Sequence, residues 1–214
     1  MKVFYIDDSI IACEKPYGVS SQSSDKENML DLIYKECGKS AFVVHRLDIT
    51  TTGLMVYALN EKCASDLCEQ VASRSFEKEY LAIVHGHTPE CGEMVDFLYH
   101  DKLKNKSFVA KTKRNGSKEA RLEYQTLDCK EIDGEILSLV KIKLLTGRTH
   151  QIRVQFSSRG FCLWGDGKYG AKDKGKIALY SHSIAFSHPK TKEKMSFFSS
   201  PEKEGVWKAF EQNL

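Results

Sequence analysis

The sequence predicts an α+β fold, in which helices flank a large mixed, mostly antiparallel sheet. Segments with the pattern of β-strands outnumber those with the pattern of helices, and the two kinds do not alternate regularly as in a parallel β-α-β fold. No linker divides the 214 residues, so we expect one domain over residues 1–214. A domain of this size buries roughly 70% of the surface of its unfolded chain, which is enough for a core without disulfide bonds.

The expected strands are short apolar runs bounded by polar or turn residues. They cover residues 3–6, 10–12, 41–44, 54–59, 78–85, 120–127, 136–145, 177–186 and 194–198. Because side chains alternate along a strand, Tyr80 and Val84 lie on the same side of theirs. A tyrosine in such a position is usually a core residue.

Three helices are expected, over residues 28–37, 60–73 and 148–159. Asn60 suits the N-cap of the second helix, because its side chain can accept a backbone hydrogen bond. The apolar residues of that helix then fall on one face. Gly160 suits the position just after the third helix, where a left-handed residue is common.

Composition and charge are those of a folded soluble protein. Hydrophobic residues make up 41% of the chain and charged residues 29%, and the net charge is only +3. The seven cysteines include no CxxC pair, which is typical of reduced thiols and not of a disulfide framework or a thiolate zinc site. No secretory leader precedes residue 30 and no apolar run approaches the ~18 residues of a membrane span. We therefore expect a cytoplasmic protein.

The loop of residues 45–53 has a composition that a packed core does not require. Asp48 comes soon after a buried apolar strand, where a carboxylate can be held as rigidly as catalysis demands. The structural alternative is a turn aspartate that binds threonine hydroxyls and backbone N–H groups. Taken alone, this segment leaves both interpretations open.

A second polar segment, Thr-Gly-Arg-Thr-His-Gln-Ile-Arg, ends at Arg153. If the helix starts near Arg148, His150 and Arg153 are i, i+3 neighbours on one face, whereas Ile152 and Phe156 face the core. Two arginines, a histidine and a glutamine at a helix start suit an anion or an RNA backbone. The alternative is an ordinary solvated helix face.

Taken together, these segments resemble the RluA-type family of RNA pseudouridine synthases. Residues 45–54 are similar to its HRLDxxTSG signature, residues 78–86 to its KxYxAxVxG strand, residues 146–153 to its TGRTHQIR segment, residues 165–170 to its GDxxYG motif, and residues 15–18 and 186–189 to its two ends. The resemblance runs in order along nearly the whole chain. It implies that residues 1–214 are a pseudouridine synthase catalytic domain, without the separate amino-terminal RNA-binding domain that some relatives carry.

The resemblance also implies the roles of four residues. The family's nucleophilic aspartate corresponds to Asp48, its active-site tyrosine to Tyr80, and its carboxylate-pairing arginine to Arg153. Arg46 corresponds to the arginine associated with base flipping. The implied reaction converts specific uridines of structured RNA, ribosomal or transfer, to pseudouridine with no cofactor and no metal.

The chemistry of this reaction explains why such residues are needed. A carboxylate can attack the nucleoside or stabilise the charge that develops as the glycosidic bond breaks. The guanidinium of Arg153 stays charged and can pair bidentately, so it would keep Asp48 ionised. The uracil must leave its stack, at a cost of a few kcal/mol. Arg46 could then fill the vacated place while Tyr80 packs against the base.

Attraction for RNA is predicted for residues 102–118, where seven of seventeen residues are cations. A charge run is usually a solvated loop, but in an RNA enzyme it suits phosphate groups. The expected RNA-binding residues are Arg46, Arg148, His150, Lys104, Lys106, Lys111 and Lys113. RNA is the expected partner, and we expect a monomer.

The sequence departs from the family pattern at three places. Thr52 stands where serine is usual, and Gln155 stands where a histidine is common. Residues 161–164 replace a more usual HPIxG-like turn. These departures leave the RNA contacts and the identity of the target uridine open, but not the chemistry.

Two rival functions follow from the same residues. A non-catalytic RNA-binding module would be expected to lose the carboxylate or its partners, yet Asp48, Tyr80 and Arg153 are all present. A metal-dependent hydrolase could use His85 and His87 with Glu90 or Asp96. No third ligand has a diagnostic spacing, so the sequence argues against this alternative.

Overall fold

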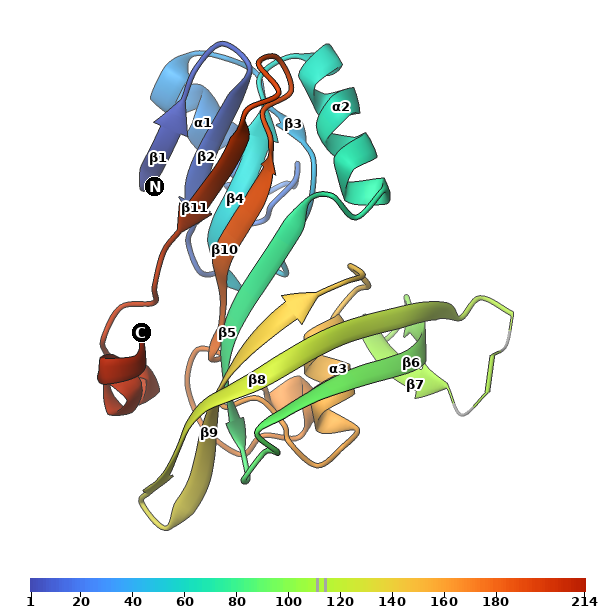
Figure 1. Ribbon diagram of the computed structural model, residues 1–214, viewed down its shortest axis with the longest axis vertical. Coiled ribbons are helices and arrows are strands. Elements are labelled where there is room, and N and C mark those ends of the chain that lie inside the picture. Colours follow the sequence, from blue (N-terminus) through green and yellow to red (C-terminus); the bar gives the residue numbers. More distant parts are fainter. Residues whose placement is uncertain (111, 114) are drawn as a thin grey trace. The chain divides into compact units, whose positions relative to one another are not determined.

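The computed structural model describes residues 1–110, 112–113 and 115–214. The strands among them (Figure 1) are β1 (Val3–Ile6), β2 (Ile10–Lys15), β3 (Phe42–Val43), β4 (Thr52–Ala58), β5 (Glu77–His85), β6 (Cys91–Asp101), β7 (Lys106–Ala110), β8 (Lys118–Ile132), β9 (Glu135–Leu144), β10 (Leu179–Ser187) and β11 (Lys194–Phe198). The helices are α1 (Met29–Cys37), α2 (Glu61–Ala72) and α3 (Gln151–Ser157), with 3-10 segments η1 (Gly167–Tyr169) and η2 (Gly205–Asn213).

The strands form a mixed sheet of eleven strands within the described ranges. The pairing of β10 with β4 is parallel, whereas β1–β2, β2–β4, β5–β9, β6–β7, β6–β8, β8–β9 and β10–β11 are antiparallel. The predicted fold class, a mostly antiparallel mixed sheet with helices, is therefore confirmed.

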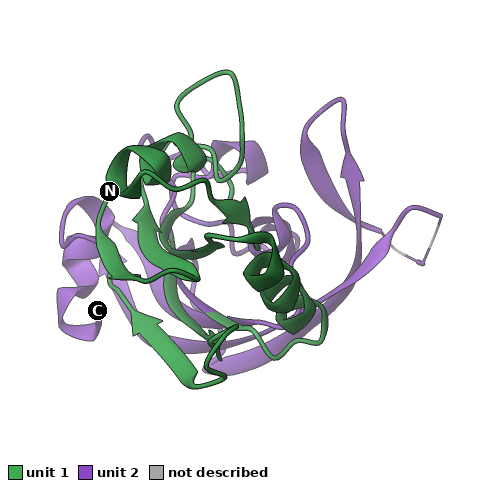
Figure 2. Ribbon diagram, turned by 90° about the horizontal axis from the view of Figure 1, so that it is seen from above, with its two compact units in different colours: residues 1–78, 180–200 green, residues 79–179, 201–214 purple. Residues whose placement is uncertain are grey.

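The chain divides into two compact units (Figure 2). Unit 1 comprises residues 1–78 and 180–200, and unit 2 comprises residues 79–179 and 201–214. The expectation of a single catalytic domain over residues 1–214 stays a prediction. No described helix is both long enough and apolar enough to cross a membrane.

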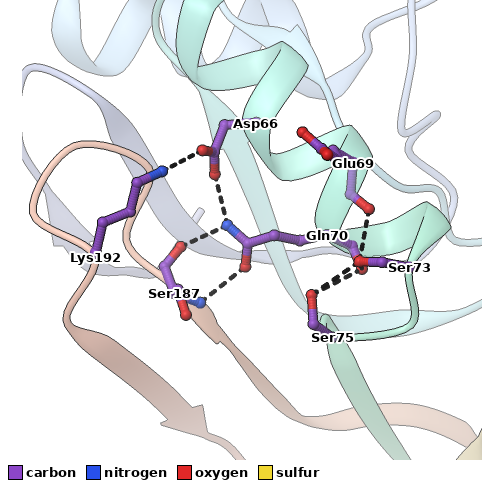
Figure 3. A pocket seen from close by; sticks show the side chains of 7 residues that line it. All are labelled: Asp66, Glu69, Gln70, Ser73, Ser75, Ser187 and Lys192. Atoms are coloured by element: carbon purple, nitrogen blue, oxygen red, sulfur yellow. Dashed lines mark hydrogen bonds and ion pairs between the residues drawn. The ribbon is translucent and has the colours of Figure 1, made fainter.

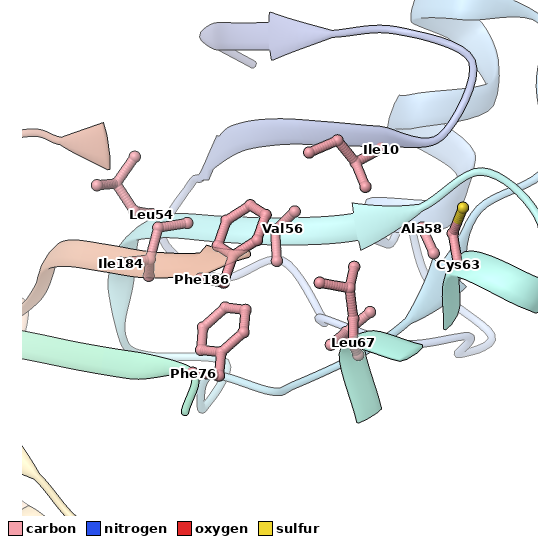
Figure 4. Close-up of a cluster of buried hydrophobic side chains, with 10 residues drawn as sticks. Ile10, Leu54, Val56, Ala58, Cys63, Leu67, Phe76, Ile184 and Phe186 are labelled. Atoms are coloured by element: carbon pink, nitrogen blue, oxygen red, sulfur yellow. The ribbon is translucent and has the colours of Figure 1, made fainter. Parts of the chain in front are cut away.

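Unit 1 has the strand order β1-β2-β4-β10, with β3 paired to β4 and β11 paired to β10. Leu67 of α2 and Val56 of β4 are fully buried in its core. The rings of Phe76 and Phe186 stack there, with their centroids 5.2 Å apart. Figure 4 shows these side chains pointing toward one another. This core gives β4, which follows the Asp48 loop directly, a rigid base.

The helices of unit 1 begin where the sequence provides caps. Asn28 accepts hydrogen bonds from the backbone N–H groups of Leu30 and Asp31, and Asn60 accepts one from Cys63. These side chains satisfy donors that a helix start leaves without intrahelical partners. The predictions for these two helices are confirmed to within one residue at each end.

Unit 2 has the strand order β5-β9-β8-β6-β7. One apolar cluster joins Ile83 of β5 to Leu139 of β9 and to Phe210 of η2. A second joins Leu98 of β6 to Val154 of α3. The sheet thus supports α3 and the segment around it, which carry Arg153.

The third helix is shorter than predicted. It begins at Gln151, and His150 precedes it with a φ of 55°. The side chain of Gln151 accepts hydrogen bonds from the Arg148 N–H (3.0 Å) and the Thr146 hydroxyl (2.8 Å), which folds the preceding residues into a turn. The expectation of a helix from Arg148, with His150 and Arg153 on one helical face, was therefore wrong. Ile152 and Phe156 are buried as predicted.

Candidate active site

The loop that carries Asp48 is fixed to the body of unit 1 on both sides of Leu47. The Ser21 hydroxyl donates to the Leu47 carbonyl (2.6 Å) and accepts from the Leu47 N–H (3.0 Å). The Asp48 carbonyl accepts from the Thr51 N–H (3.0 Å), which closes a turn before β4. Asp48 itself is half-buried. Its backbone is thus held in a defined conformation, as the functional interpretation of this segment requires.

The side chain of Lys15 also supports this loop. It is fully buried, and Nζ donates to the carbonyls of Pro16 (2.9 Å), Val19 (2.9 Å) and Ile49 (3.2 Å). Burial lowers the pKa of Lys15 to about 8, although the nearby Asp48 carboxylate favours the charged form. Lys15 belongs to the family motif at residues 15–18, but the sequence did not show that its side chain binds the backbone of the loop that carries Asp48.

His45 joins the loop to β4. Its Nε2 accepts a hydrogen bond from the Val56 N–H (3.2 Å), so the ring proton is on Nδ1. Burial, assisted by Lys78, lowers the pKa of His45 to about 3, and the ring packs 5.2 Å from that of Phe76. His45 is therefore a neutral structural residue of the Asp48 loop.

Gly53 allows β4 to pass close to β10. Its φ is 111°, and a Cβ atom added there would lie 2.4 Å from the Ser181 carbonyl oxygen. Any larger residue would displace the parallel pairing of β4 with β10. The glycine of the HRLDxxTSG motif is therefore required by backbone packing.

Arg46 differs from its neighbours in being exposed. Its Nη1 donates to the Gln22 side-chain oxygen (3.1 Å). The Arg46 guanidinium, two residues before Asp48, is accessible to solvent. Arg46 and Asp48 thus belong to one ordered loop of unit 1.

Tyr80 and Arg153 belong to unit 2. Tyr80 is buried in β5, where it pairs in register with Ile142 of β9. Arg153 is also buried, and it forms a bidentate pair with Asp166: Nε lies 2.7 Å from Oδ2 and Nη2 lies 2.8 Å from Oδ1. The Arg153 guanidinium lies over the ring of Tyr169. Its orientation is therefore set by a carboxylate and an aromatic ring.

Asp166 and Tyr169 were not assigned roles from the sequence, although they stand in the GDxxYG segment. Tyr169 accepts a hydrogen bond from the Ser107 N–H (2.8 Å) and also contacts Nδ1 of His150 (3.0 Å). Burial raises the pKa of Tyr169. These contacts connect β7, η1 and the residue before α3, so the segment fixes Arg153 from several directions.

The predicted RNA-binding residues of unit 2 fall into different environments. His150 is buried and bonded to Tyr169, and Arg148 donates to the Glu119 carbonyl (2.8 Å). Lys106 donates to the Lys168 carbonyl (2.6 Å). Lys104 and Lys113 are exposed, whereas Lys111 lies outside the described residues. The exposed pair is the part of this set whose surroundings suit phosphate groups best.

The segment 102–118 is not simply a loop. Residues 106–110 form β7, which pairs with β6 in a hairpin. At its tip the Asp101 carboxylate accepts from the N–H groups of Leu103 and Lys104 (both 3.0 Å). The lysines on this hairpin are therefore presented by an ordered turn.

Gln155, a departure from the family pattern, has a structural partner. Its amide nitrogen donates to Asp96 Oδ2 (2.7 Å), and Arg159 binds the same carboxylate (2.9 Å). Asp96 was one candidate ligand of the metal-hydrolase alternative. Its engagement by Gln155 and Arg159 provides a different reason for a carboxylate there.

A hollow of about 290 Å³ lies on unit 1 (Figure 3). The Gln70 amide bridges it, since it donates to the Ser187 carbonyl (2.8 Å) and to Asp66 (2.7 Å) and accepts from the Ser187 N–H (2.9 Å). Lys192 pairs with Asp66. These polar groups bind one another, and their contacts connect α2 to the β10–β11 hairpin. The hollow is therefore not the candidate active site.

Comparison with known proteins identifies the class to which this fold and these motifs belong. A family model described as RNA pseudouridylate synthase matches residues 9–158. The chain belongs to this family, of the RluA type, and is an RNA pseudouridine synthase that isomerises uridine in RNA. The sequence-based resemblance is confirmed.

Particular relatives are similar over most of the chain. The tRNA pseudouridine synthase C of Haemophilus ducreyi is 31% identical, with 92% of this chain and 89% of the relative covered. The dual-specificity RNA pseudouridine synthase RluA of Yersinia pestis is 29% identical, with 92% and 97% covered. The structure of human RNA pseudouridylate synthase domain containing 1 has a TM-score of 0.82 at 21% identity, covering 97% of this chain and 86% of that one. This last likeness concerns the fold.

The buried Lys15 leads to a prediction about pH. Its pKa is about 8 in the folded chain, against an ordinary lysine value of 10.5 for the unfolded chain. Between pH 8 and pH 10.5 the unfolded chain therefore binds more protons than the folded chain. The free energy of unfolding should therefore rise with pH in this window. Relative to Lys15→Met, wild type should gain roughly 1–3 kcal/mol between pH 7 and pH 10, as measured by urea denaturation at each pH. The exposed Lys62→Met is the control, and parallel curves for wild type and Lys15→Met would contradict the prediction.

Proposed function

We propose that this enzyme isomerises specific uridines of structured ribosomal or transfer RNA by an aspartate-dependent, cofactor-free mechanism with base flipping. The observation that carries the proposal is the double hydrogen bond of Ser21 to Leu47, which holds the backbone next to Asp48. A catalytic group must be held to within about 0.5 Å of its productive position. The fixed backbone and the half-buried side chain of Asp48 support this role.

In the proposed reaction the C1′–N1 bond of uridine breaks, the uracil turns, and C5 bonds to C1′. A proton leaves C5 and N1 carries one in the product, so the balance needs no oxidant, reductant or other reactant. The Asp48 carboxylate forms or stabilises the intermediate at the sugar or the base. Tyr80 packs against the uracil and assists removal of the C5 proton.

Arg153 is the proposed partner of the Asp48 carboxylate. A guanidinium stays charged and can pair bidentately with carboxylates, and the bidentate pair with Asp166 fixes the direction of this one. Its burial strengthens such an interaction, because the effective dielectric constant is lower there than in water. The role that the family resemblance implies for Arg153 is to keep Asp48 ionised.

The RNA is held mainly through its phosphates. Arg46 fills the place that the flipped base leaves, while Lys104, Lys106, Lys111, Lys113, Arg148 and His150 serve the backbone. Among these, Lys104 and Lys113 have exposed side chains, so we test these two first. The names of relatives include a transfer RNA enzyme, a dual-specificity enzyme and a ribosomal large subunit enzyme, and they support either kind of RNA. The monomeric state and the cytoplasmic location stay predictions.

The first test of this mechanism is Asp48→Asn. The variant should fold and bind RNA but form no pseudouridine, because an amide supplies neither the nucleophile nor the negative charge. Tritium release from C5-labelled RNA measures turnover, and filter binding measures affinity. Turnover above about a hundredth of wild type, a residual barrier change under about 2.7 kcal/mol, would falsify the assignment.

Arg153→Lys tests the need for a fixed guanidinium. Lysine retains the charge but not the bidentate geometry, so kcat should fall by roughly 100-fold while the Michaelis constant for RNA changes little. Arg159→Lys is the matched control, since it alters another arginine–aspartate pair, with Asp96, that is more exposed. Equal losses of kcat in the two variants would show that Arg153 has no special role.

The salt dependence of binding tests the exposed lysines. In the double variant Lys104→Ala/Lys113→Ala, each lost phosphate contact should reduce the slope of log affinity against log salt by about 0.7–0.9. The site of modification should stay the same, because phosphate contacts position RNA without reading its bases. The control is Lys203→Ala/Lys208→Ala, which removes the same charge from exposed positions. An unchanged slope in the first variant would place the RNA elsewhere.

A further inference from the structure

A cluster of His85, Glu135 and Asp173 in unit 2 has no part in the proposed chemistry. His85 is the last residue of β5. Its Nε2 lies 2.7 Å from Asp173 Oδ2, and its Nδ1 lies 3.1 Å from Glu135 Oε2. The side chains of His85 and Asp173 are only 19% and 16% exposed, whereas Glu135 is at the surface. One imidazole is therefore held between two carboxylates.

The three side chains contain ligand types that metals use, and their ligand atoms lie within 4.8 Å of one another. The geometry nevertheless suits hydrogen bonds better than an ion. The two nitrogens of an imidazole point away from each other; here Nε2 is hydrogen-bonded to Asp173, and Nδ1 lies 3.1 Å from Glu135 Oε2. One ion could not take both nitrogens.

Asp173 carries this arrangement to a second element. The same Oδ2 atom that meets His85 accepts a hydrogen bond from the Gly165 N–H (3.1 Å). Gly165 has a φ of 77°, and a Cβ atom added there would lie 2.8 Å from the Lys176 carbonyl oxygen. The turn at Gly165 is therefore tightly enclosed, and the Asp173 carboxylate fixes one of its N–H groups.

The residue after Gly165 is Asp166, the bidentate partner of Arg153. The Asp166 carboxylate is almost fully buried, and its backbone carbonyl accepts from the Tyr169 and Ala171 N–H groups. Any shift of the turn at Gly165 moves this carboxylate, and with it the guanidinium of Arg153.

β5 is connected to the same turn by its backbone as well. The His85 N–H donates to the Cys162 carbonyl (2.9 Å), and the Trp164 N–H donates to the Ile83 carbonyl (2.9 Å). β5 also carries Tyr80, five residues before His85. One strand thus links the tyrosine of the proposed chemistry to the turn that orients Arg153.

We propose that His85 is a positioning residue for the isomerisation. Held between Glu135 and Asp173, it fixes the Gly165–Asp166 turn and thereby the guanidinium of Arg153. The inference rests on the proposed role of Arg153. It adds a chain of contacts that supports the Arg153–Asp166 pair and runs from Glu135 through His85 and Asp173 to Gly165.

The test is His85→Gln, which removes the imidazole and keeps one amide donor group. Because the turn would lose its anchor while the RNA contacts remain, kcat should fall roughly 10- to 100-fold with a Michaelis constant within about twofold of wild type. Asp173→Asn should show the same pattern, and the double variant should be no worse than the poorer single variant. The matched control is His87→Gln, at an exposed position two residues away, which should retain wild-type kcat.

A direct measurement separates positioning from loss of fold. In ¹⁵N-labelled protein the Gly165 amide signal should shift in His85→Gln and in Asp173→Asn, but not in His87→Gln. Glu135→Gln, changed at the exposed end of the chain of contacts, should shift it less and lower kcat by only a few-fold. It remains informative if the buried variants fail to fold. Wild-type kcat in His85→Gln, or a fall in kcat with an unmoved Gly165 signal, would overturn the inference.

The outcome is distinguishable from failure of the proposed mechanism. If Asp48→Asn and Arg153→Lys keep full turnover, the catalytic assignment is wrong whatever His85 does. If both lose turnover as expected while His85→Gln retains it, only the positioning role is wrong.

Discussion

The buried ion pair between Arg153 and Asp166 is the interaction on which the proposed site of unit 2 depends. Both side chains are almost fully buried, so removal of either would leave an uncompensated charge, at a cost of about 3–5 kcal/mol. Such a pair stabilises a fold less than apolar packing would, but it fixes the direction of the guanidinium. The Tyr169 ring, which the guanidinium lies over, and Asp173, which binds the Gly165 N–H, support that direction.

In unit 1 the position of Asp48 is fixed through its backbone. Its loop is fixed by neutral hydrogen bonds from Ser21 and by the buried ammonium of Lys15. A lysine in such a place satisfies three carbonyls that a loop would otherwise leave without donors. The Asp48 carboxylate lies near this lysine and favours its charged form.

Sequence patterns predicted most elements of the fold and singled out the motif residues, whose catalytic roles stay predictions. Helix caps such as Asn28 and Asn60 and the apolar runs of the strands are local signals, so α1, α2 and most strands could be placed. The start of α3 could not, because it depends on the Gln151 side chain binding back to residues 146–148. The role of Asp166 was equally hidden, since it arises from a contact across thirteen residues. The network at His85 depends on three separate elements and leaves no local pattern.

The cationic segment shows why charge alone is a weak guide to RNA contact. Lys106 and His150 looked like RNA-binding residues, yet Lys106 donates to a backbone carbonyl and lies 5.0 Å from the Tyr169 ring centre. His150 is buried against the same tyrosine. A side chain already ordered by the fold loses little entropy on binding, but it also has fewer donors to offer a phosphate. Lys106 and His150 both contact Tyr169, whose ring lies against the Arg153 guanidinium, whereas Lys104 and Lys113 are exposed. Contact of any of these residues with RNA stays a prediction.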